Sequence, residues 1–438
     1  NITGATNPFS FTQAGTFDVG TVGPIVGVTT NDGIITLTAS AGDLTMSQNV
    51  STGGTAAVNL TSTAGLISQS GTAIVNGTLL TTSSATGTTL TNNNTVASFN
   101  GSNSGAGNIS LTDLAGIDIV SISNAVGNVT LTNTGAITDS GTINTGLLTT
   151  VSDGGTVLDA GHTVTSFNAT NTTGGNVVLS DAGGVDITGI SNAVGNVTLT
   201  NTGAITQSGA INTGLLTTSS AGGTTLAGAN TVTSFSGSNA TSGNISLSDA
   251  GGIDIVSISN AVGNVTLTNT GAITDSGTIN TGLLTTVSDG GTVLDAGHTV
   301  TSFNATNTTG GNVQLVNAIG TLTVTGISQA GNGTTTVNNT GALTVSGGVT
   351  TTGTGTVTLQ SSGTQTISAD ITASAGPASV TLTSTGGNLV LNNNVNAGTA
   401  QVALNAPTGT ITQNAGTITA GALGVSATAA PTITTAGT

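Results

Sequence analysis

Apolar and small polar residues alternate over short stretches of the chain, and Gly, Asn, Asp and Ser separate the stretches. In Val129-Thr130-Leu131-Thr132 every second residue is apolar, and residues 135–138 offer a second such stretch after a turn. Ile143 and Leu147-Leu148 supply a third. Alternation with period two is typical of a half-buried β-strand, whereas Gly, Asn, Asp and Ser favour turns. The pattern therefore predicts strands of about three to five residues joined by tight turns.

This pattern returns with a fixed 68-residue period. The segment SNAVGNVTLTNTGAIT occurs unchanged at 123–138, 191–206 and 259–274, and residues 116–177 are identical to residues 252–313. A second motif, T-V-x-S-F, marks four copies of the unit, and its copies end at Phe99, Phe167, Phe235 and Phe303. Repetition at such a period predicts a solenoid, because one unit cannot bury its own apolar face and stacked units can.

A shorter Gly-bounded motif begins at residues 127, 155, 175 and 195, and it divides each unit into about three turns of roughly 20 to 27 residues. Short strands at this rhythm predict an all-β fold, a parallel β-helix, also called a β-solenoid. We expect about twenty coils, stacked at ~4.8 Å, with a 68-residue super-repeat of three coils. The interior of such a fold is a set of continuous apolar columns.

Two recurring side chains have predicted places in this solenoid. The four Phe residues of the T-V-x-S-F motif are interpreted as interior plugs, not as a surface for stacking ligands. Asn128, Asn196 and Asn264 follow Gly at corners, where Asn accepts left-handed backbone conformations and can stack in amide ladders.

The periodicity also predicts three regions. Residues 1–30 hold Phe9, Phe11 and Phe17 together with two of the five Pro residues, and they are interpreted as an amino-terminal cap, a connector or an irregular first coil. Residues 31–313 form the regular solenoid of 68-residue units. Residues 314–438 continue with looser coils of different sequence.

The charge balance excludes several classes of function. The chain has no Lys and no Arg, and its formal charge is −16. Binding to nucleic acids or to anionic membrane surfaces requires basic side chains, so neither is expected. No apolar run approaches the ~18 residues of a membrane-spanning helix, which predicts no membrane insertion. We expect any signal peptide to lie outside this sequence. Since Cys is absent, there is no disulfide or thiolate chemistry.

Candidate chemistry centres on aspartates and two histidines. Aspartates five residues apart recur in successive units, and such pairs serve inverting glycosidases; they are Asp113 with Asp118, Asp181 with Asp186, and Asp249 with Asp254. Because an active site needs one constellation and these pairs recur, we predict no catalytic residues and no enzyme. His162 and His298 occupy equivalent places where a third unit has Asn230, so both are predicted to be exposed turn residues.

Metal and ice binding are also weighed against the sequence. The G-G-x-G-x-D signature of calcium-binding β-rolls is absent, and Asp153-Gly154-Gly155 is interpreted as a turn. No metal or cofactor site is predicted, although weak surface binding of Ca²⁺ stays open. The triplet Thr130-Leu131-Thr132 is similar to ice-binding motifs, but it recurs once per three predicted coils and so forms no flat Thr array.

Segments such as GNVTLTNTGAITQSGAI and GDLTMSQNVSTGGTAAVNLTSTAGLISQSG resemble the repeat regions of filamentous haemagglutinin-like proteins, the large adhesins of bacterial two-partner secretion systems. The resemblance extends from about residue 30 to the last residue. It implies a right-handed β-helix that is exported as a long surface fibre and acts in attachment, aggregation or biofilm cohesion. The chain departs from the family in having no Lys or Arg.

Two functions follow as expectations. The first is an extracellular structural fibre on the bacterial surface or in its matrix, stiff and protease-resistant, whose partner is a second copy bound head to tail or a neighbouring solenoid segment. The second is an adhesin stalk or binding module whose lateral Thr, Asn and Asp side chains contact glycans, cations or ice. Residues 100–302 contain only Phe167 and Phe235 as aromatic residues, so the fibre is preferred.

Overall fold

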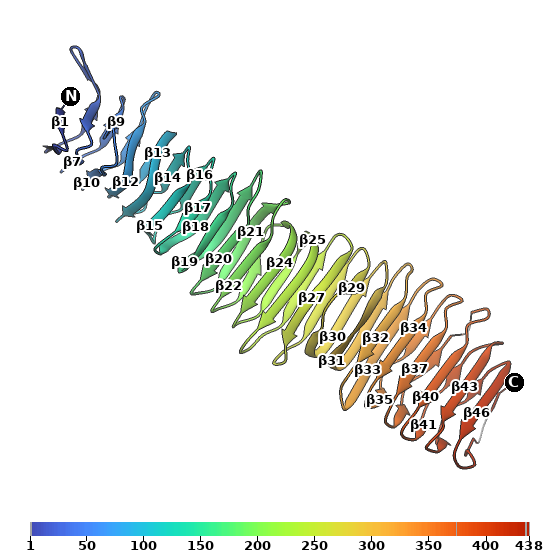
Figure 1. The fold of residues 1–438 in the computed structure, drawn as a ribbon. Helices are drawn as coiled ribbons and strands as arrows, with labels where there is room; N and C mark the ends of the chain where they lie inside the picture. Colours follow the sequence, from blue (N-terminus) through green and yellow to red (C-terminus); the bar gives the residue numbers. More distant parts are fainter. Residues whose placement is uncertain (1, 374, 434–435, 438) are drawn as a thin grey trace. The chain divides into compact units, whose positions relative to one another are not determined.

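The computed structural model describes residues 2–373, 375–433 and 436–437 of the chain. Described residues form strands, turns and bends and contain no helix, and the parallel strands stack into a β-solenoid of about 19 turns (Figure 1). The predicted all-β solenoid of about twenty coils is therefore confirmed. In this described part of the chain, no helix is long and apolar enough to cross a membrane.

The chain divides into two compact units, Asn1–Thr217 and Thr218–Thr438, which are described separately. The strands of the first compact unit are β1 (Ile2–Ala5), β2 (Phe9–Gln13), β3 (Phe17–Val19), β4 (Thr21–Val22), β5 (Ile25–Val26), β6 (Val28–Asn31), β7 (Ile35–Ala39), β8 (Leu44–Met46), β9 (Val50–Ser51), β10 (Val58–Ser62), β11 (Ile67–Gln69), β12 (Val75–Ser84), β13 (Thr88–Asn103), β14 (Ile109–Asp113), β15 (Ile117–Asn124), β16 (Val129–Asn133), β17 (Ile137–Asp139), β18 (Ile143–Ser152), β19 (Thr156–Asn171), β20 (Val177–Asp181), β21 (Val185–Asn192), β22 (Val197–Asn201) and β23 (Ile205–Gln207).

Strand β24 (Ile211–Ser220) contains residues of both compact units. The remaining strands are β25 (Thr224–Asn239), β26 (Ile245–Asp249), β27 (Ile253–Asn260), β28 (Val265–Asn269), β29 (Ile273–Asp275), β30 (Ile279–Ser288), β31 (Thr292–Asn307), β32 (Val313–Asn317), β33 (Thr321–Gln329), β34 (Thr335–Asn339), β35 (Ala342–Val345), β36 (Val349–Thr351), β37 (Val357–Ser361), β38 (Gln365–Ile367), β39 (Ile371–Thr372), β40 (Val380–Ser384), β41 (Leu389–Leu391), β42 (Val395–Asn396), β43 (Gln401–Ala406), β44 (Ile411–Gln413), β45 (Ile418–Thr419), β46 (Ala422–Ala427) and β47 (Ala436–Gly437).

Register between strands gives the length of a turn. In the first compact unit one stack of paired residues is Ile109, Val129, Leu148, Phe167 and Ile187, each one turn beyond the last. A turn here therefore takes roughly 20 residues, at the short end of the range for solenoid repeats. Phe167 lies three turns beyond Ile109, and Ile187 lies four turns beyond it.

The 68-residue repeat makes three and a half turns, so the prediction of three coils per repeat is wrong. Val177 is the position one repeat beyond Ile109, and in sequence it lies midway between Phe167 and Ile187. It belongs to a second stack, with Thr156 before it and Val197 after it. Equivalent positions of successive repeats thus lie in different stacks, and the Gly-bounded motif marks strands of both.

The second compact unit has the same arrangement. Ile245 stacks with Val265, whereas Val313, the equivalent position one repeat later, stacks with Thr292. The alternation between stacks is therefore a property of the repeat and not of one part of the chain.

Apolar side chains of the alternating stretches fill the interior. Buried positions alternate along β7, β10 and β16, and the inward residues include Ile35, Leu37 and Leu131. The four repeated Phe side chains are completely buried, which confirms their prediction as interior plugs; they are Phe99, Phe167, Phe235 and Phe303. Because each inward residue packs on its counterparts one turn before and after, the core consists of continuous columns.

The corner asparagines form a ladder between side chain and backbone. The Asn128 backbone N–H donates to Asn108 Oδ1 at 3.0 Å, and Asn128 Oδ1 accepts the N–H of Leu147 at 3.2 Å. Asn196 and Asn264 donate to the Asn side chains one turn earlier in the same way. The predicted left-handed conformation is wrong: within the described ranges, positive φ at non-Gly residues occurs only at Thr6 and Asp32. The side-chain oxygen of Asn128 reaches the next turn without a left-handed backbone at the corner.

Candidate functional site at the amino-terminal end

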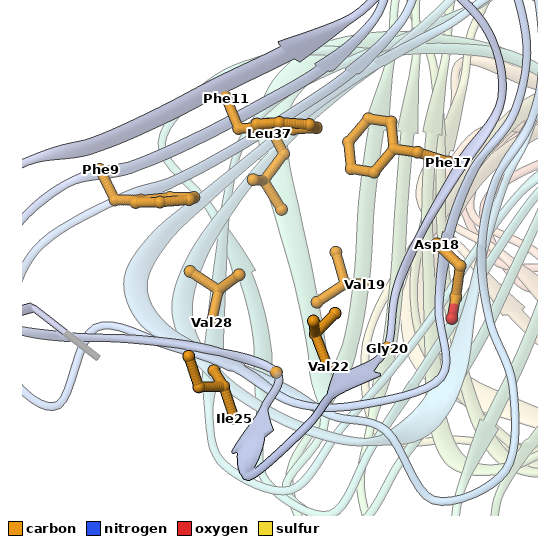
Figure 2. Close-up of a pocket in the computed structure, with 11 residues that line it drawn as sticks. Phe9, Phe11, Phe17, Asp18, Val19, Gly20, Val22, Ile25, Val28 and Leu37 are labelled. Carbon is orange, nitrogen blue, oxygen red and sulfur yellow. The ribbon is translucent and has the colours of Figure 1, made fainter.

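An open apolar cavity lies at the first turn of the first compact unit. Its volume is about 170 Å³, and it is lined by Phe9, Phe11, Phe17, Asp18, Val19, Gly20, Val22, Ile25, Gly27, Val28 and Leu37. Figure 2 shows the three Phe rings on one side, Val22 and Ile25 on the other, and Leu37, Val19 and Val28 between them. The cavity therefore has an almost entirely apolar lining at the end of the interior column.

Strands β2 and β3 form one wall of this cavity. Phe9 and Phe11 pair in register with Ile35 and Leu37 of the next turn, so they occupy core positions of the column. The Phe11 and Phe17 rings meet edge to face, with centroids 5.2 Å apart and an angle of 75° between the planes. Phe11 is nevertheless 42% exposed, because no described strand lies on its outer side.

A hairpin forms the opposite wall. Strands β4 and β5 pair antiparallel around Gly23 and Pro24, and Gly23 has φ 60°, a value that suits Gly at a tight turn. The hairpin exposes apolar side chains: Val22 is 78% exposed, and Ile25 and Val26 are also exposed. The exposed face of this hairpin is therefore largely apolar.

Asp18 is the one charged residue of the lining, and its carboxylate points away from the three Phe rings (Figure 2). Its Oδ1 accepts hydrogen bonds from the Thr45 hydroxyl at 2.9 Å and from the Ser47 backbone N–H at 3.0 Å, and its Oδ2 accepts one from the Ser47 hydroxyl. These bonds join the first turn to the second. The cavity itself therefore offers apolar contact and not ionic recognition.

His162 and His298 are completely buried, so the prediction that they are exposed turn residues is wrong. Nδ1 of His162 accepts the backbone N–H of Ile143 at 3.0 Å, and Nδ1 of His298 accepts that of Ile279 at 3.0 Å. In another copy Asn94 Oδ1 accepts the N–H of Val75 at 2.8 Å. The position requires a hydrogen-bond acceptor for the neighbouring turn, and both Asn and His supply one.

Each buried His faces a carboxylate. His162 Nε2 is 3.5 Å from Asp139 Oδ2, and His298 Nε2 is 3.4 Å from Asp275 Oδ2. Because Nδ1 accepts a hydrogen bond, the neutral imidazole carries its proton on Nε2, toward the carboxylate. The repeat with Asn230 in place of His has Gln207 in place of Asp. Thus the two positions change together within the chain, as expected for partners.

The aspartates of each predicted pair have separate structural tasks. Asp113 is buried, and its carboxylate accepts the backbone N–H groups of Val96 at 2.8 Å and Ala115 at 2.9 Å. Asp118 is half-buried and accepts the hydroxyl of Ser140, one turn on, at 2.8 Å. The pairs at 181/186 and 249/254 repeat this division. Each member of a pair bonds to a different turn.

Burial shifts the pKa values of several of these groups. Desolvation lowers the pKa of His162 and of His298, although Asp139 and Asp275, respectively, oppose the shift. Desolvation raises the pKa of the Asp113 and Asp249 carboxyls, against the effect of their backbone hydrogen bonds. In all four cases the folded state favours the neutral form.

Stability should therefore depend on pH in two opposite windows. The His contribution is present above the ordinary His pKa of 6.5 and is lost as pH falls through the lowered pKa of the folded state. The Asp113 and Asp249 contribution is fully present below the ordinary Asp pKa of 3.8 and is lost as pH rises through the raised pKa. We expect the denaturation midpoint in guanidinium chloride to fall as pH drops below 6.5 and to recover partly as pH falls further toward 3.8. Exchange of both His–Asp pairs for Asn–Gln should abolish the first decline only.

Asp153-Gly154-Gly155 forms a turn, as predicted, with Gly155 at φ 100°. No group of three or more His, Cys, Asp or Glu side chains that could hold a metal ion occurs within the described residues. The sequence signal for the amino-terminal cavity was the concentration of Phe and Pro in residues 1–30. The cavity itself could not be predicted from it, because its shape depends on which strands pair.

Comparison with protein-family models, with curated proteins and with solved structures finds no match for this chain.

Proposed function

We propose that the chain is a structural protein of the bacterial cell surface or extracellular matrix, a stiff and protease-resistant fibre that grows by stacking of coils. One observation carries the proposal: paired strands of successive turns keep a parallel register and share one apolar column, as in Val357, Val380 and Val402. In such stacking the backbone N–H and C=O groups bond to the neighbouring turns, so few polar groups are left to act in binding or catalysis. Copies of the chain, or neighbouring solenoid segments, associate head to tail.

Lateral polar groups support this role over that of a binding module. Asp118, Asp186 and Asp254 each accept a Ser hydroxyl of the next turn, and the Asn ladder bonds side chains to backbone N–H groups. These side chains hold turns together. Attachment to glycans through the same faces is the alternative, and binding of the folded chain to a glycan array would favour it.

Protease digestion tests the fibre proposal. Trypsin has no cleavage site, because Lys and Arg are absent. Chymotrypsin should cut the native chain only near exposed residues such as Phe11 and Leu114, and it should leave bonds after Phe99 and Phe167 intact until the chain unfolds. Mass spectrometry of timed digests measures this. Early native cleavage after Phe99 or Phe167 would contradict the proposal, and the guanidinium-unfolded chain is the control.

A further inference from the structure

Two asparagines of the ladder in the second compact unit differ in the residue that follows them. Asn312 and Asn332 precede the paired strands β32 and β34, and the Oδ1 atom of each accepts a backbone N–H of the following turn, at 3.0 Å and 3.1 Å respectively. Val313 follows Asn312, whereas Gly333 follows Asn332. Asn-Gly is the dipeptide in which Asn most readily loses its side-chain nitrogen, because Gly has no side chain to hinder the attack of its own backbone nitrogen on the Asn amide.

The backbone nitrogen of Gly333 is not held by the sheet. Val313, which follows the asparagine one turn earlier, donates its N–H to the carbonyl of Thr334 at 2.8 Å. Gly333 lies before β34, whose first residue is Thr335, and its N–H donates to no other described residue. Asn332 is exposed and Gly333 is half-buried, so water and hydroxide reach this dipeptide.

The ladder also prepares the Asn332 amide for attack. Attack on its Cγ atom places negative charge on Oδ1, and the Thr354 backbone N–H already donates to that oxygen. A donor fixed in advance at the atom where charge develops stabilises the transition state. Nδ2 of Asn332, the leaving nitrogen, donates to no other described residue, so no hydrogen bond to the described chain opposes its departure.

We propose that Asn332-Gly333 is a self-modification site, which converts spontaneously to aspartate and isoaspartate in the folded chain and so removes one rung of the ladder. Hydroxide takes the proton of the Gly333 nitrogen, and this nitrogen forms a bond to Asn332 Cγ. The Cγ–Nδ2 bond breaks, and Nδ2 takes up protons from water and leaves as ammonia. Water then opens the succinimide ring: addition at Cγ gives aspartate, and addition at the main-chain carbonyl gives isoaspartate. Water is the only co-reactant, and no atom is oxidised or reduced.

Isoaspartate changes the course of the main chain at this corner. Its main chain runs through Cβ and Cγ of the former Asn332, so the oxygen that Thr354 binds becomes part of a longer main-chain link. The Thr354 N–H thereby loses its acceptor, and the turn that it holds loosens. This inference does not depend on the proposed function, because the reaction requires only the folded turn.

The native chain contains its own control, a second Asn-Gly dipeptide at Asn100-Gly101 in the first compact unit. This dipeptide lies inside β13 and pairs with β12 on one side and with β15 on the other. Its nitrogen reaches the Asn100 amide only when the sheet opens locally. The folded chain is incubated at mildly alkaline pH and digested with pepsin in acid, and mass spectrometry measures deamidation at both sites. We expect Asn332 to react roughly tenfold faster than Asn100, or more.

The same incubation in guanidinium chloride should bring the two rates together, because neither dipeptide is then held by a fold. Equal rates in the folded chain would overturn the proposal, and so would an equally large difference in the unfolded chain.

Hydrogen exchange tests the loss of the rung. Modified chains are separated from unmodified ones by anion exchange, and the Thr354 amide should exchange faster in the isoaspartate form. The control is Asn332→Asp, which has the same added charge and an unaltered main chain and should keep the protection of this amide. Equal exchange in the isoaspartate form and in this variant would overturn the loss of the rung.

Discussion

Replacement of Phe167 by alanine should lower the free energy of local unfolding by about 3–5 kcal/mol, the usual cost of removing a buried Phe ring. Phe167 is fully buried and lies in the stack between Leu148 and Ile187. Repeat proteins couple mainly to adjacent turns, so the loss should concentrate there. Native-state hydrogen exchange at the backbone amides of the two neighbouring turns measures it.

Phe11→Ala is the matched control for this prediction. Like Phe167, Phe11 occupies an inward position of a stack, but it lies in the first turn and is partly exposed. Its replacement should cost less than about half as much, because the ring already contacts solvent. Equal losses in the two variants would mean that Phe167 does not act as an interior plug.

Replacement of His162 by alanine should be the second largest effect. Alanine leaves the buried Ile143 N–H without its acceptor, at a cost of about 1–3 kcal/mol, and the empty imidazole space adds a cavity cost. The Asp139 carboxylate, which accepts the N–H groups of Asp159 and Ala160, loses the imidazole it faces. Denaturation in urea at pH 7, followed by far-ultraviolet circular dichroism, measures the change.

The chain itself supplies the control. The double variant His162→Asn/Asp139→Gln reproduces the residues of the repeat that has Asn230 and Gln207, so it should retain most of the stability that His162→Ala loses. His162→Asn alone should be less stable than the double variant, because Asp139 then faces an amide instead of an imidazole. Additive single effects in this double-mutant cycle would show that the two side chains are not coupled.

Local pattern was sufficient to predict the strands and the class of fold. Alternation in Val129 to Thr132 defines which side chains point inward, and a 68-residue period requires stacking of similar units. The number of turns per repeat could not be predicted in the same way. The Gly-bounded motif occurs on strands of both stacks, so its spacing counts half turns as well as whole ones.

Polar residues of the interior were misjudged for a physical reason. His and Asp are usually exposed, and a single sequence does not show that Ile143 and Val96 present N–H groups to them across a turn. Only the register reveals this need for an acceptor. The amino-terminal cavity has a similar origin: the Phe residues were visible in the sequence, but their exposure follows from the lack of a described strand outside β2.

The half-integral number of turns per repeat bears on how genes for such chains change length. Successive 68-residue repeats share identical stretches, such as residues 123–138, 191–206 and 259–274, and identical stretches in tandem invite unequal recombination, which adds or removes whole copies. Each stack accepts the same sequence, as Ile109 and Val177 show by occupying different stacks at equivalent positions. A recombinant with an odd change in copy number therefore keeps every strand paired, although surface features beyond the junction move to the opposite side; an even change leaves them where they were. Variants that differ in the number of repeats should thus still fold, and the change should affect only interactions made by the outer surface of the solenoid.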